Sequence, residues 1–291
     1  MKDGKRGAGF LLLAIFFVAY VLFLYGPMLV IVVLSFQGPE GGLTFPMRGW
    51  STHWFQQLAE GLGTVDISAA LLRSLGVGAA VMVLTVLLSV LAGLAFRKKL
   101  RGGSVLFFIV VASLIMPSII VSLGIGLEFR LLDGAVKKLL EQWGWQETLD
   151  NYGSALGLYT SVLGAHLSWT LPFGLLIMFA VFNRFNRSYE EAARDLGATP
   201  WQSFRHVVLP LIAPSVVGIG MFGFTLSWDE IARSSQAIGD VNTLPLELQG
   251  LTTTVTTPAI YALGTLILLV SFAVMGLAVG LSALLNRRRR A

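Results

Sequence analysis

The sequence predicts an all-α membrane protein with six transmembrane helices. The first observation is composition: of 291 residues, 55% are hydrophobic and 13% are charged, whereas soluble chains carry roughly 25% charged residues. The second is a mean hydropathy of +0.75, concentrated in apolar stretches long enough to cross a bilayer, which takes about 20 helical residues. The third is that basic residues gather between alternate stretches. These features exclude a soluble domain.

Six apolar stretches are expected to cross the membrane. The first is too long for the h-region of a cleaved signal peptide and has no small-x-small cleavage site, so we expect a retained helix. The expected spans are residues 10–34, 67–96, 104–127, 154–182, 211–231 and 258–285.

Lysine and arginine placement predicts the orientation of these spans. With the N terminus inside, the cytoplasmic segments hold fifteen of the 21 basic residues but only four of the 16 acidic ones. Because cytoplasmic loops carry an excess of Lys and Arg, both termini are expected in the cytoplasm. The Arg287–Arg290 run is then a membrane-surface anchor rather than a nucleic-acid-binding patch.

Two segments are expected on the outer side. Trp50, Trp54 and Leu58 have i, i+4, i+8 spacing, with Phe55 beside them. This pattern favours an amphipathic helix that lies in the outer interface, or one that packs under the outer rim of the helices. Residues 133–150 have helical spacing as well.

Neither outer segment has enough apolar residues for a separate domain. We therefore expect one domain with a detachable first helix. The expected organisation is a first helix plus outer segment over residues 1–66, a transmembrane core over 67–286 and a basic cytoplasmic tail over 287–291.

Two spans contain residues that interrupt helices. Met116, Pro117 and Ser118 lie about twelve residues into the third span, and proline lacks the N–H that a helix needs. The fourth span clusters His166 and Pro172 near its middle. Interrupted helices at that depth occur where protein or a wet cavity satisfies the freed backbone groups. These residues indicate either a translocation path or helix–helix packing, and His166 alone also fits a satisfied interior histidine.

The fifth span ends in Trp228, Asp229 and Glu230. Carboxylates at the end of a spanning helix are costly unless they are hydrated, paired or functional. Three interpretations stay open: hydration at the outer boundary, an outer gate that attracts a cationic solute, and pairing with Arg233.

The loop between the fourth and fifth spans is expected to fold as two short helices joined by a glycine. Ser188 and Glu191 have capping-box spacing, Gly197 suits the end of a helix, and Thr199 and Gln202 form a second box. A rigid loop of this kind at the membrane face suits docking to another protein. The docking residues are expected to be Ser188, Glu190, Glu191, Ala192, Ala193, Asp195, Gly197, Leu209 and Pro210.

The same loop resembles the EAA signature of ABC importer permease subunits. Glu191-Ala192-Ala193, three residues, Gly197, nine residues and then Val207-Val-Leu-Pro reproduce every spacing of the signature. The one departure is Val207, where the family usually has Ile. The resemblance implies the type I ABC importer permease fold in a bacterial inner membrane, with the loop as the coupling helix that seats in the ATPase.

The resemblance also implies the partners. The chain has nothing like a Walker A loop, so ATP and magnesium would be used by a separate pair of ATP-binding subunits. This chain would bind no cofactor, metal or nucleic acid and would catalyse no reaction. A second, non-identical permease subunit would complete the path through the lipid membrane, and an extracytoplasmic solute-binding protein would deliver the solute.

A subfamily resemblance suggests the solute. Residues 224–230, 244–246 and 257–262 look like the second permease subunit of spermidine/putrescine-type importers. That subfamily usually carries a carboxylate just after the proline of the third span, where this chain has Ser118. An ammonium in a low-dielectric passage needs a counter-charge. The subfamily resemblance implies a polyamine-like cation, while the neutral Ser118 favours the alternative of opines, amino-acid-like compounds or other small organic solutes.

Two other function classes compete with an importer permease. An intramembrane enzyme would have to use Asp229, Glu230 and His166, but these residues form no metal triad, and the chain has no Cys, no H-E-x-x-H and no G-x-S-x-G. A proton-coupled secondary transporter is compatible with six spans. It would work without an ATPase, which makes co-purification the discriminating observation.

Overall fold

The computed structural model describes residues 8–61, 65–97, 101–254 and 256–287. Within these ranges it is helical apart from one isolated bridge between Gln37 and Trp50. The first seven residues, Lys98, Lys99 and most of the expected basic tail lie outside the described residues. The elements are α1 Ala8–Leu34, α2 His53–Glu60, α3 Ile67–Phe96, α4 Gly103–Ala112, α5 Ser118–Gln142, α6 Gln146–Asp150, η1 Leu158–Val162, α7 Leu163–Asn183, α8 Ser188–Asp195, α9 Pro200–Ser203, η2 Phe204–Val208, α10 Leu209–Trp228, α11 Leu244–Thr254 and α12 Ala259–Arg287, where η marks a π-helical turn.

Five helical runs in the described residues are long and apolar enough to cross a membrane. They agree with five of the six expected spans. The runs are Gly9–Leu34, Ile67–Phe96, Leu158–Asn183, Pro200–Trp228 and Ala259–Leu277.

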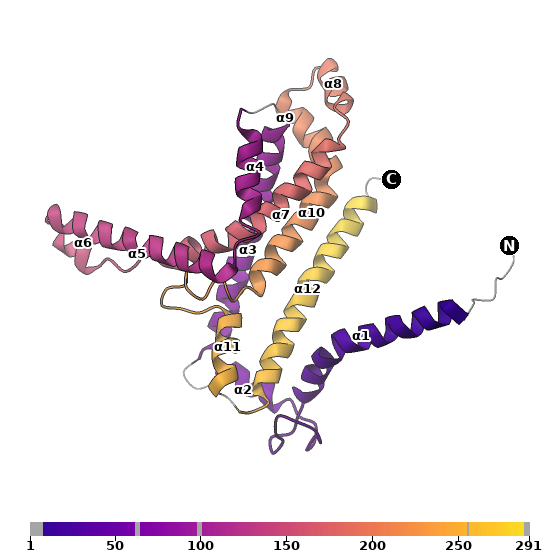
Figure 1. Ribbon diagram of the computed structural model, residues 1–291, viewed down its shortest axis with the longest axis vertical. Helices are drawn as coiled ribbons and strands as arrows, with labels where there is room; N and C mark the ends of the chain where they lie inside the picture. The colour runs from indigo at the N-terminus through magenta and orange to yellow at the C-terminus, as the bar shows by residue number, and fades with distance from the viewer. Residues whose placement is uncertain (1–7, 62–64, 98–100, 255, 288–291) are drawn as a thin grey trace. The chain divides into compact units, whose positions relative to one another are not determined.

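The prediction of a third span over residues 104–127 was wrong. We expected one kinked helix, but α4 ends at Ala112 and α5 begins at Ser118. The cause is Pro117, which has no N–H and disfavours helical geometry at the residue before it. The 10 residues of α4 extend about 15 Å, half of a hydrocarbon core about 30 Å thick. In Figure 1, α5 points away from the direction of α4.

The fourth expected span is also different from its prediction. We expected a break between His166 and Pro172, but α7 is continuous from Leu163 to Asn183 with Pro172 inside it. The irregular geometry lies earlier, in the π-helical turn η1. Neighbouring helices that surround a buried proline can accommodate it within a spanning helix.

The chain divides into two compact units. One comprises residues 1–68 and 248–270, and the other residues 69–247 and 271–291.

In the larger unit, α3, α7 and α10 pack directly on one another, and α4 lies against α7 (Figure 1). Thr85 on α3 and Thr170 on α7 share a buried hydrogen bond of 2.7 Å. A Cβ at Gly174 would collide with Ser89 and Ile219, so this close approach requires glycine, as small residues allow between membrane helices. A buried apolar cluster continues the contact: Val90, Met178, Phe182, Val208, Ile212 and Ile219.

The smaller unit is organised around Gln37, which is fully buried. Its carboxamide oxygen accepts from the Arg48 N–H at 2.7 Å, and its backbone carbonyl accepts from Trp54 Nε1 at 2.7 Å. Trp54 and Leu58 are the buried face of α2, as expected. Trp50 is a correction: it precedes α2, pairs with Gln37 and is exposed, because the helix begins only at His53.

The segment after α6 is held to α5 by Asp133. Its carboxylate accepts from the Tyr152 hydroxyl at 2.7 Å, the Ser154 hydroxyl at 2.5 Å and the Ala155 N–H at 2.7 Å. Desolvation acts to raise the pKa of Asp133, but the hydrogen bonds from Ser154, Ala155 and Tyr152 outweigh it and hold the pKa below its usual value. The expected outer segment 133–150 is thus helical and continues α5.

Candidate functional site

The loop between α7 and α10 has the expected helix–glycine–helix form. α8 ends at Asp195, and Gly197 has φ +87°. The Gly197 N–H donates to the Arg194 carbonyl at 2.8 Å, and the Ala198 N–H donates to the Ala193 carbonyl at 3.0 Å. These two bonds are the Schellman pattern, which needs a left-handed residue at this position. Gly197 therefore fixes the angle at which the chain leaves α8.

One of the two expected capping boxes is present. Thr199 accepts from the Gln202 N–H at 3.3 Å, and the Gln202 side chain accepts from the Thr199 N–H at 2.8 Å. Pro200 occupies the first position of α9. The box at Ser188 was wrong: Ser188 is already inside α8, Arg187 takes the cap position without a side-chain bond, and the Ser188 N–H donates to Asn186 Oδ1 at 3.0 Å.

The second helix of the loop does not stop at Pro210. α9, η2 and α10 form one helical run of 29 residues, Pro200–Trp228. Pro210 has no N–H to donate to the preceding turn, and the π-helical turn η2 comes directly before it. A wider turn at this point relieves the clash that proline creates in a regular helix. The elbow at Gly197 is therefore followed by a helix that reaches the far end of the span.

α8 has two different faces. Arg187, Glu190, Glu191 and Arg194 repeat at i, i+3, i+4 and i+7 and line a cavity between α8, α9 and α3. Tyr189, Ala192, Ala193 and Leu196 follow the opposite side of the helix. Tyr189 is exposed, and Leu196 is 90% exposed. This side of α8 therefore exposes apolar groups, whereas the opposite side is charged.

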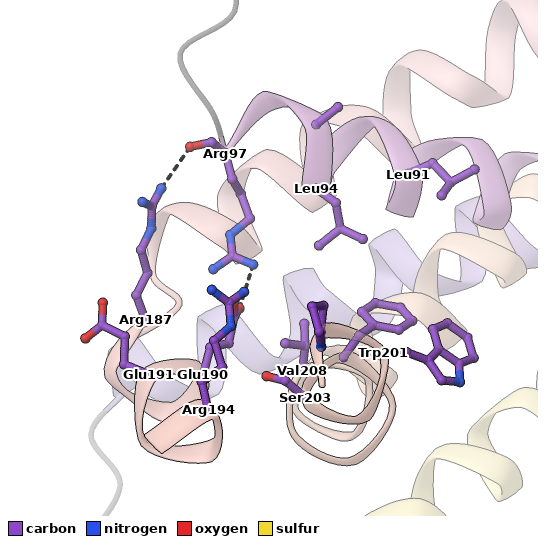
Figure 2. Close-up of a pocket in the computed structure, with 13 residues that line it drawn as sticks. Leu91, Leu94, Arg97, Arg187, Glu190, Glu191, Arg194, Trp201, Ser203 and Val208 are labelled. Carbon is purple, nitrogen blue, oxygen red and sulfur yellow. Dashed lines mark hydrogen bonds and ion pairs between the residues drawn. The ribbon is translucent and has the colours of Figure 1, made fainter. Parts of the chain in front are cut away.

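The cavity next to α8 has a volume of about 760 Å³. Its charged wall is organised by Arg97 at the end of α3, which forms an ion pair of 2.6 Å with Glu190 (Figure 2). The Arg97 guanidinium also lies 5.0 Å from the ring centre of Phe182 and 5.1 Å from that of Phe185. Arg187 donates to the Arg97 carbonyl at 2.8 Å. These contacts fix α8 to the end of a spanning helix.

At the other end of α10, polar side chains from several elements meet. His166 on α7 is buried, and its ring nitrogens lie 2.7 Å from the Ser227 hydroxyl and 2.8 Å from the Ser234 hydroxyl. One imidazole nitrogen donates and the other accepts when the ring is neutral. Both are occupied, so the structure places His166 as a satisfied interior residue.

Arg233 is the most unusual residue of this polar cluster. Its side chain is 0% exposed. One guanidinium nitrogen donates to the Ser168 hydroxyl at 2.5 Å, and the group lies 4.9 Å from the ring centre of Trp169. Its Nε and Nη2 atoms have no hydrogen-bond partner. The Glu230 carboxylate accepts from the Arg233 backbone N–H at 2.9 Å, and among the described residues no ion pair joins the two side chains.

Two serines connect the broken third span to this cluster. Ser113, just after α4, donates to the Ser168 carbonyl at 2.8 Å. Ser122 on α5 donates to the Arg233 carbonyl at 2.7 Å and accepts from the Gln236 N–H at 3.1 Å. The break therefore lies against the segment that follows α10.

The expected path residues differ in their surroundings. Met116, Pro117 and Asp229 are exposed, Ser118 and Glu230 are half-buried, and Trp228 is buried against Phe224 with its rings stacked at 5.8 Å. Among the described residues no group of three or more His, Cys, Asp or Glu side chains could hold a metal ion. The structure thus brings Glu230 and His166 into one cluster and leaves Met116 and Pro117 at its edge.

Two residues were not anticipated from the sequence: Arg97 and Leu196. Arg97 was counted only as a charge, because no short-range pattern links it to Glu190. Arg233 was considered only as a partner for the carboxylates at 229 and 230, whereas its guanidinium contacts Ser168. Leu196 could have been found, since it is an apolar residue directly before the glycine elbow in an otherwise polar helix.

Comparison with known proteins identifies the family. The model of the binding-protein-dependent transport system inner membrane component family matches residues 85–290. The putrescine transport system permease protein PotI of Escherichia coli K12 is 31% identical over 249 residues, which cover 84% of this chain and 82% of that protein. The spermidine/putrescine transport system permease protein PotC of Haemophilus influenzae is 28% identical over 281 residues, 96% of this chain and 97% of that protein.

Solved structures confirm the fold. A bacterial ABC transporter involved in the import of the acidic polysaccharide alginate has a chain that aligns with a TM-score of 0.64 at 17% identity, over 96% of both chains. A chain of the MetNI methionine ABC transporter aligns with a TM-score of 0.50 at 17% identity, over 77% of this chain and 99% of that one. The expectations of a helical ABC-importer permease fold and of a multi-pass inner-membrane protein are confirmed. This chain belongs to the family of binding-protein-dependent transport system inner membrane components, whose members are permease subunits of ABC importers and not enzymes.

Proposed function

We propose that this chain forms one half of the translocation path of an ATP-driven importer and that α8 is its coupling helix. ATP and magnesium act on a separate pair of ATP-binding subunits. Those subunits meet the face of α8 that carries Tyr189, Ala192, Ala193 and Leu196, with Gly197 holding that face outward. This proposal changes the expected docking set, because Glu190 and Glu191 line the cavity on the other side of α8. The loop and both chain termini then lie on the cytoplasmic side, as the Lys and Arg distribution requires.

The observation that carries this proposal is the unbroken helical run Pro200–Trp228. Its 29 residues extend about 43 Å at 1.5 Å per residue, from the elbow at Gly197 to Asp229 and Glu230. A rigid helix of this length transmits a displacement of the loop to the polar cluster around Arg233. Coupling between distant sites requires such a connected element.

The proposed solute is a small organic cation such as putrescine or spermidine. Two relatives carry these solutes in their names. Asp229 is exposed and Glu230 half-buried directly after α10, so two carboxylates are available at the end of the path. Carboxylates near a passage attract cations and raise their local concentration.

The remaining partners follow from what one permease subunit supplies. We propose a second, non-identical permease subunit opposite residues 67–286 and an extracytoplasmic solute-binding protein above the outer segments. The exposed apolar surface of α1 and α12 then faces lipid or the second permease subunit.

Uptake of labelled putrescine into cells that express the complete transporter tests this function. We expect uptake that stops when ATP is depleted while the proton gradient is kept. Uptake that persists without ATP would contradict an ABC importer and favour a proton-coupled transporter.

Leu196→Asp tests the docking face. The added charge is expected to abolish co-purification of the ATP-binding subunits and uptake, with unchanged amounts of permease in the membrane. Arg184→Asp is the matched control, because it adds an acidic residue to the same loop outside α8. Equal loss in both variants, or normal co-purification with Leu196→Asp, would exclude this face as the docking surface.

A second candidate solute is amino-acid-like and carries a carboxylate as well as an amine. The buried guanidinium of Arg233, with two unpartnered nitrogens, and the neutral Ser118 favour it, because a buried cation needs a counter-charge. Competition by 4-aminobutyrate or an opine against labelled putrescine separates the candidates. Stronger competition by the zwitterion than by spermidine would favour the second.

A further inference from the structure

The cavity beside α8 combines two kinds of wall. One wall is apolar and comes from the last turns of α3, with Leu91, Leu94 and Ala95, and from Trp201 and Phe204 on the other side. Leu91 is exposed, Trp201 is 64% exposed, and the Trp201 and Phe204 rings stack at 5.6 Å. These side chains offer a partly exposed apolar lining.

The other wall is charged. Arg97, Arg187 and Arg194 reach the cavity together with Glu190 and Glu191, which leaves a net positive charge. Figure 2 shows Arg97 entering from α3 and Arg187 and Arg194 from α8. Arg97 is engaged by Glu190, while the Arg194 side chain is exposed and has no ion pair among the described residues. The cavity thus has arginine on one side and aromatic and aliphatic groups on the other.

We propose that this cavity binds an anionic phospholipid. The headgroup phosphate would lie between Arg187 and Arg194, and one acyl chain would run along Leu91, Leu94 and Trp201. The location fits: α3 is a spanning helix, and the cavity begins where its apolar residues give way to Arg97. Acyl chains meet headgroups at this level, basic pockets there bind anionic headgroups, and aromatic rings favour the same depth.

A protein partner fits the cavity less well than lipid. The ATP-binding subunit is proposed to meet the opposite face of α8, which carries the exposed Tyr189 and Leu196. Arg187, Glu190, Glu191 and Arg194 face away from that surface because they repeat with helical period on the cavity side. An anionic lipid here would fill the space between α3 and the coupling helix and stiffen the contact that transmits motion.

The complete transporter is placed in nanodiscs that contain equal amounts of phosphatidylglycerol and phosphatidylcholine. After its release from the nanodiscs, native mass spectrometry measures how much phosphatidylglycerol stays bound to it. Each arginine near an anionic surface contributes about fivefold to lipid binding. We therefore expect about fivefold weaker retention for Arg194→Gln and about 25-fold for Arg187→Gln with Arg194→Gln. Ala95→Phe should reduce retention by filling the acyl wall without any change of charge.

The matched control is Arg184→Gln with Arg205→Gln, which removes two positive charges from the same loop outside the cavity. Unchanged retention in this control supports a specific site, and an equal loss would show only general attraction to the leaflet and overturn the proposal. Displacement of the lipid by inorganic phosphate would indicate a headgroup-only anion site and also overturn it. So would efficient crosslinking of a cysteine at position 95 to a partner subunit, because that result places protein in the cavity.

This test is independent of the transported solute and of docking. Failed uptake with normal lipid retention would count against the importer function alone, whereas normal uptake without selective retention would count against the lipid site alone.

Discussion

Arg97 and Glu190 form an ion pair of 2.6 Å that joins the end of α3 to α8. The side chains are 14% and 15% exposed, so the pair is largely shielded from water. α8, the proposed coupling helix, is consequently fixed to the end of α3, and not only to its two neighbours in the chain.

Exchanging the charges of this pair tests its role. Glu190→Arg leaves two guanidinium groups facing each other, and the loss of a charged contact costs on the order of 2 kcal/mol. We expect lower ATP-dependent uptake and a lower midpoint of thermal unfolding. Adding Arg97→Glu should restore part of both, which a double-mutant cycle measures. Additive losses would mean that the pair contributes nothing.

The elbow at Gly197 should tolerate few residues. At its φ of +87°, a residue with a Cβ atom is less favourable than glycine by about 1 to 2 kcal/mol. Gly197→Ala is expected to reduce uptake and ATPase stimulation, and Gly197→Asp to abolish uptake, with the permease still in the membrane. Gly197→Asn is the control, since Asn adopts left-handed geometry more readily, and it should be milder than Ala. Normal uptake by Gly197→Asp would refute the need for this elbow.

The N-terminal cap of α9 can be tested with two substitutions of different severity. Thr199→Ala removes the side-chain acceptor for the Gln202 N–H, a loss typically worth about 1 kcal/mol. We expect faster hydrogen exchange in residues 200–203 and reduced uptake. Thr199→Ser keeps the hydroxyl and should behave as the parent. Equal exchange in both variants would show that the cap does not hold the start of this helix.

Substitution of His166 tests whether this residue stabilises the fold or contacts the solute. His166→Leu removes the partner of the Ser227 hydroxyl, while the Ser234 hydroxyl keeps its bond to the Glu230 carbonyl. An unsatisfied buried group costs about 1 to 3 kcal/mol. We expect a lower unfolding midpoint with an unchanged KM for the solute. Ser235→Ala is the control, because that hydroxyl donates only to Ala232 in its own turn. A changed KM with normal stability would instead place His166 in contact with the solute.

Short-range sequence patterns predicted those features of the loop between α7 and α10 that depend only on neighbouring residues. The Schellman turn at Gly197 and the box at Thr199 depend on a few adjacent residues, so the sequence predicts them directly. The Ser188 box failed because Asn186 satisfies the Ser188 N–H, which lets the helix start earlier. A competing partner two residues away was enough to change the cap.

The membrane spans likewise include some features that depend on the nearby sequence and others that depend on residues far apart in the chain. Hydropathy predicted five spanning runs correctly, because the cost of exposing polar groups to lipid depends on composition alone. It failed at residues 104–127, where Pro117 ends the helical hydrogen bonding and the serines at 113 and 122 find partners on α7 and after α10. These partners were not predictable from spacing.

By itself, the sequence determined a membrane-embedded helical permease, five of its spanning stretches and a helix–glycine–helix loop. Each of these depends on hydrophobic length, charge asymmetry and short-range capping. Only the tertiary structure decided that Arg97 holds α8, that Arg233 is buried beside Ser168, and that the loop continues unbroken into α10. Such contacts join residues far apart in the chain, and the free energy of each depends on the burial and geometry that packing creates.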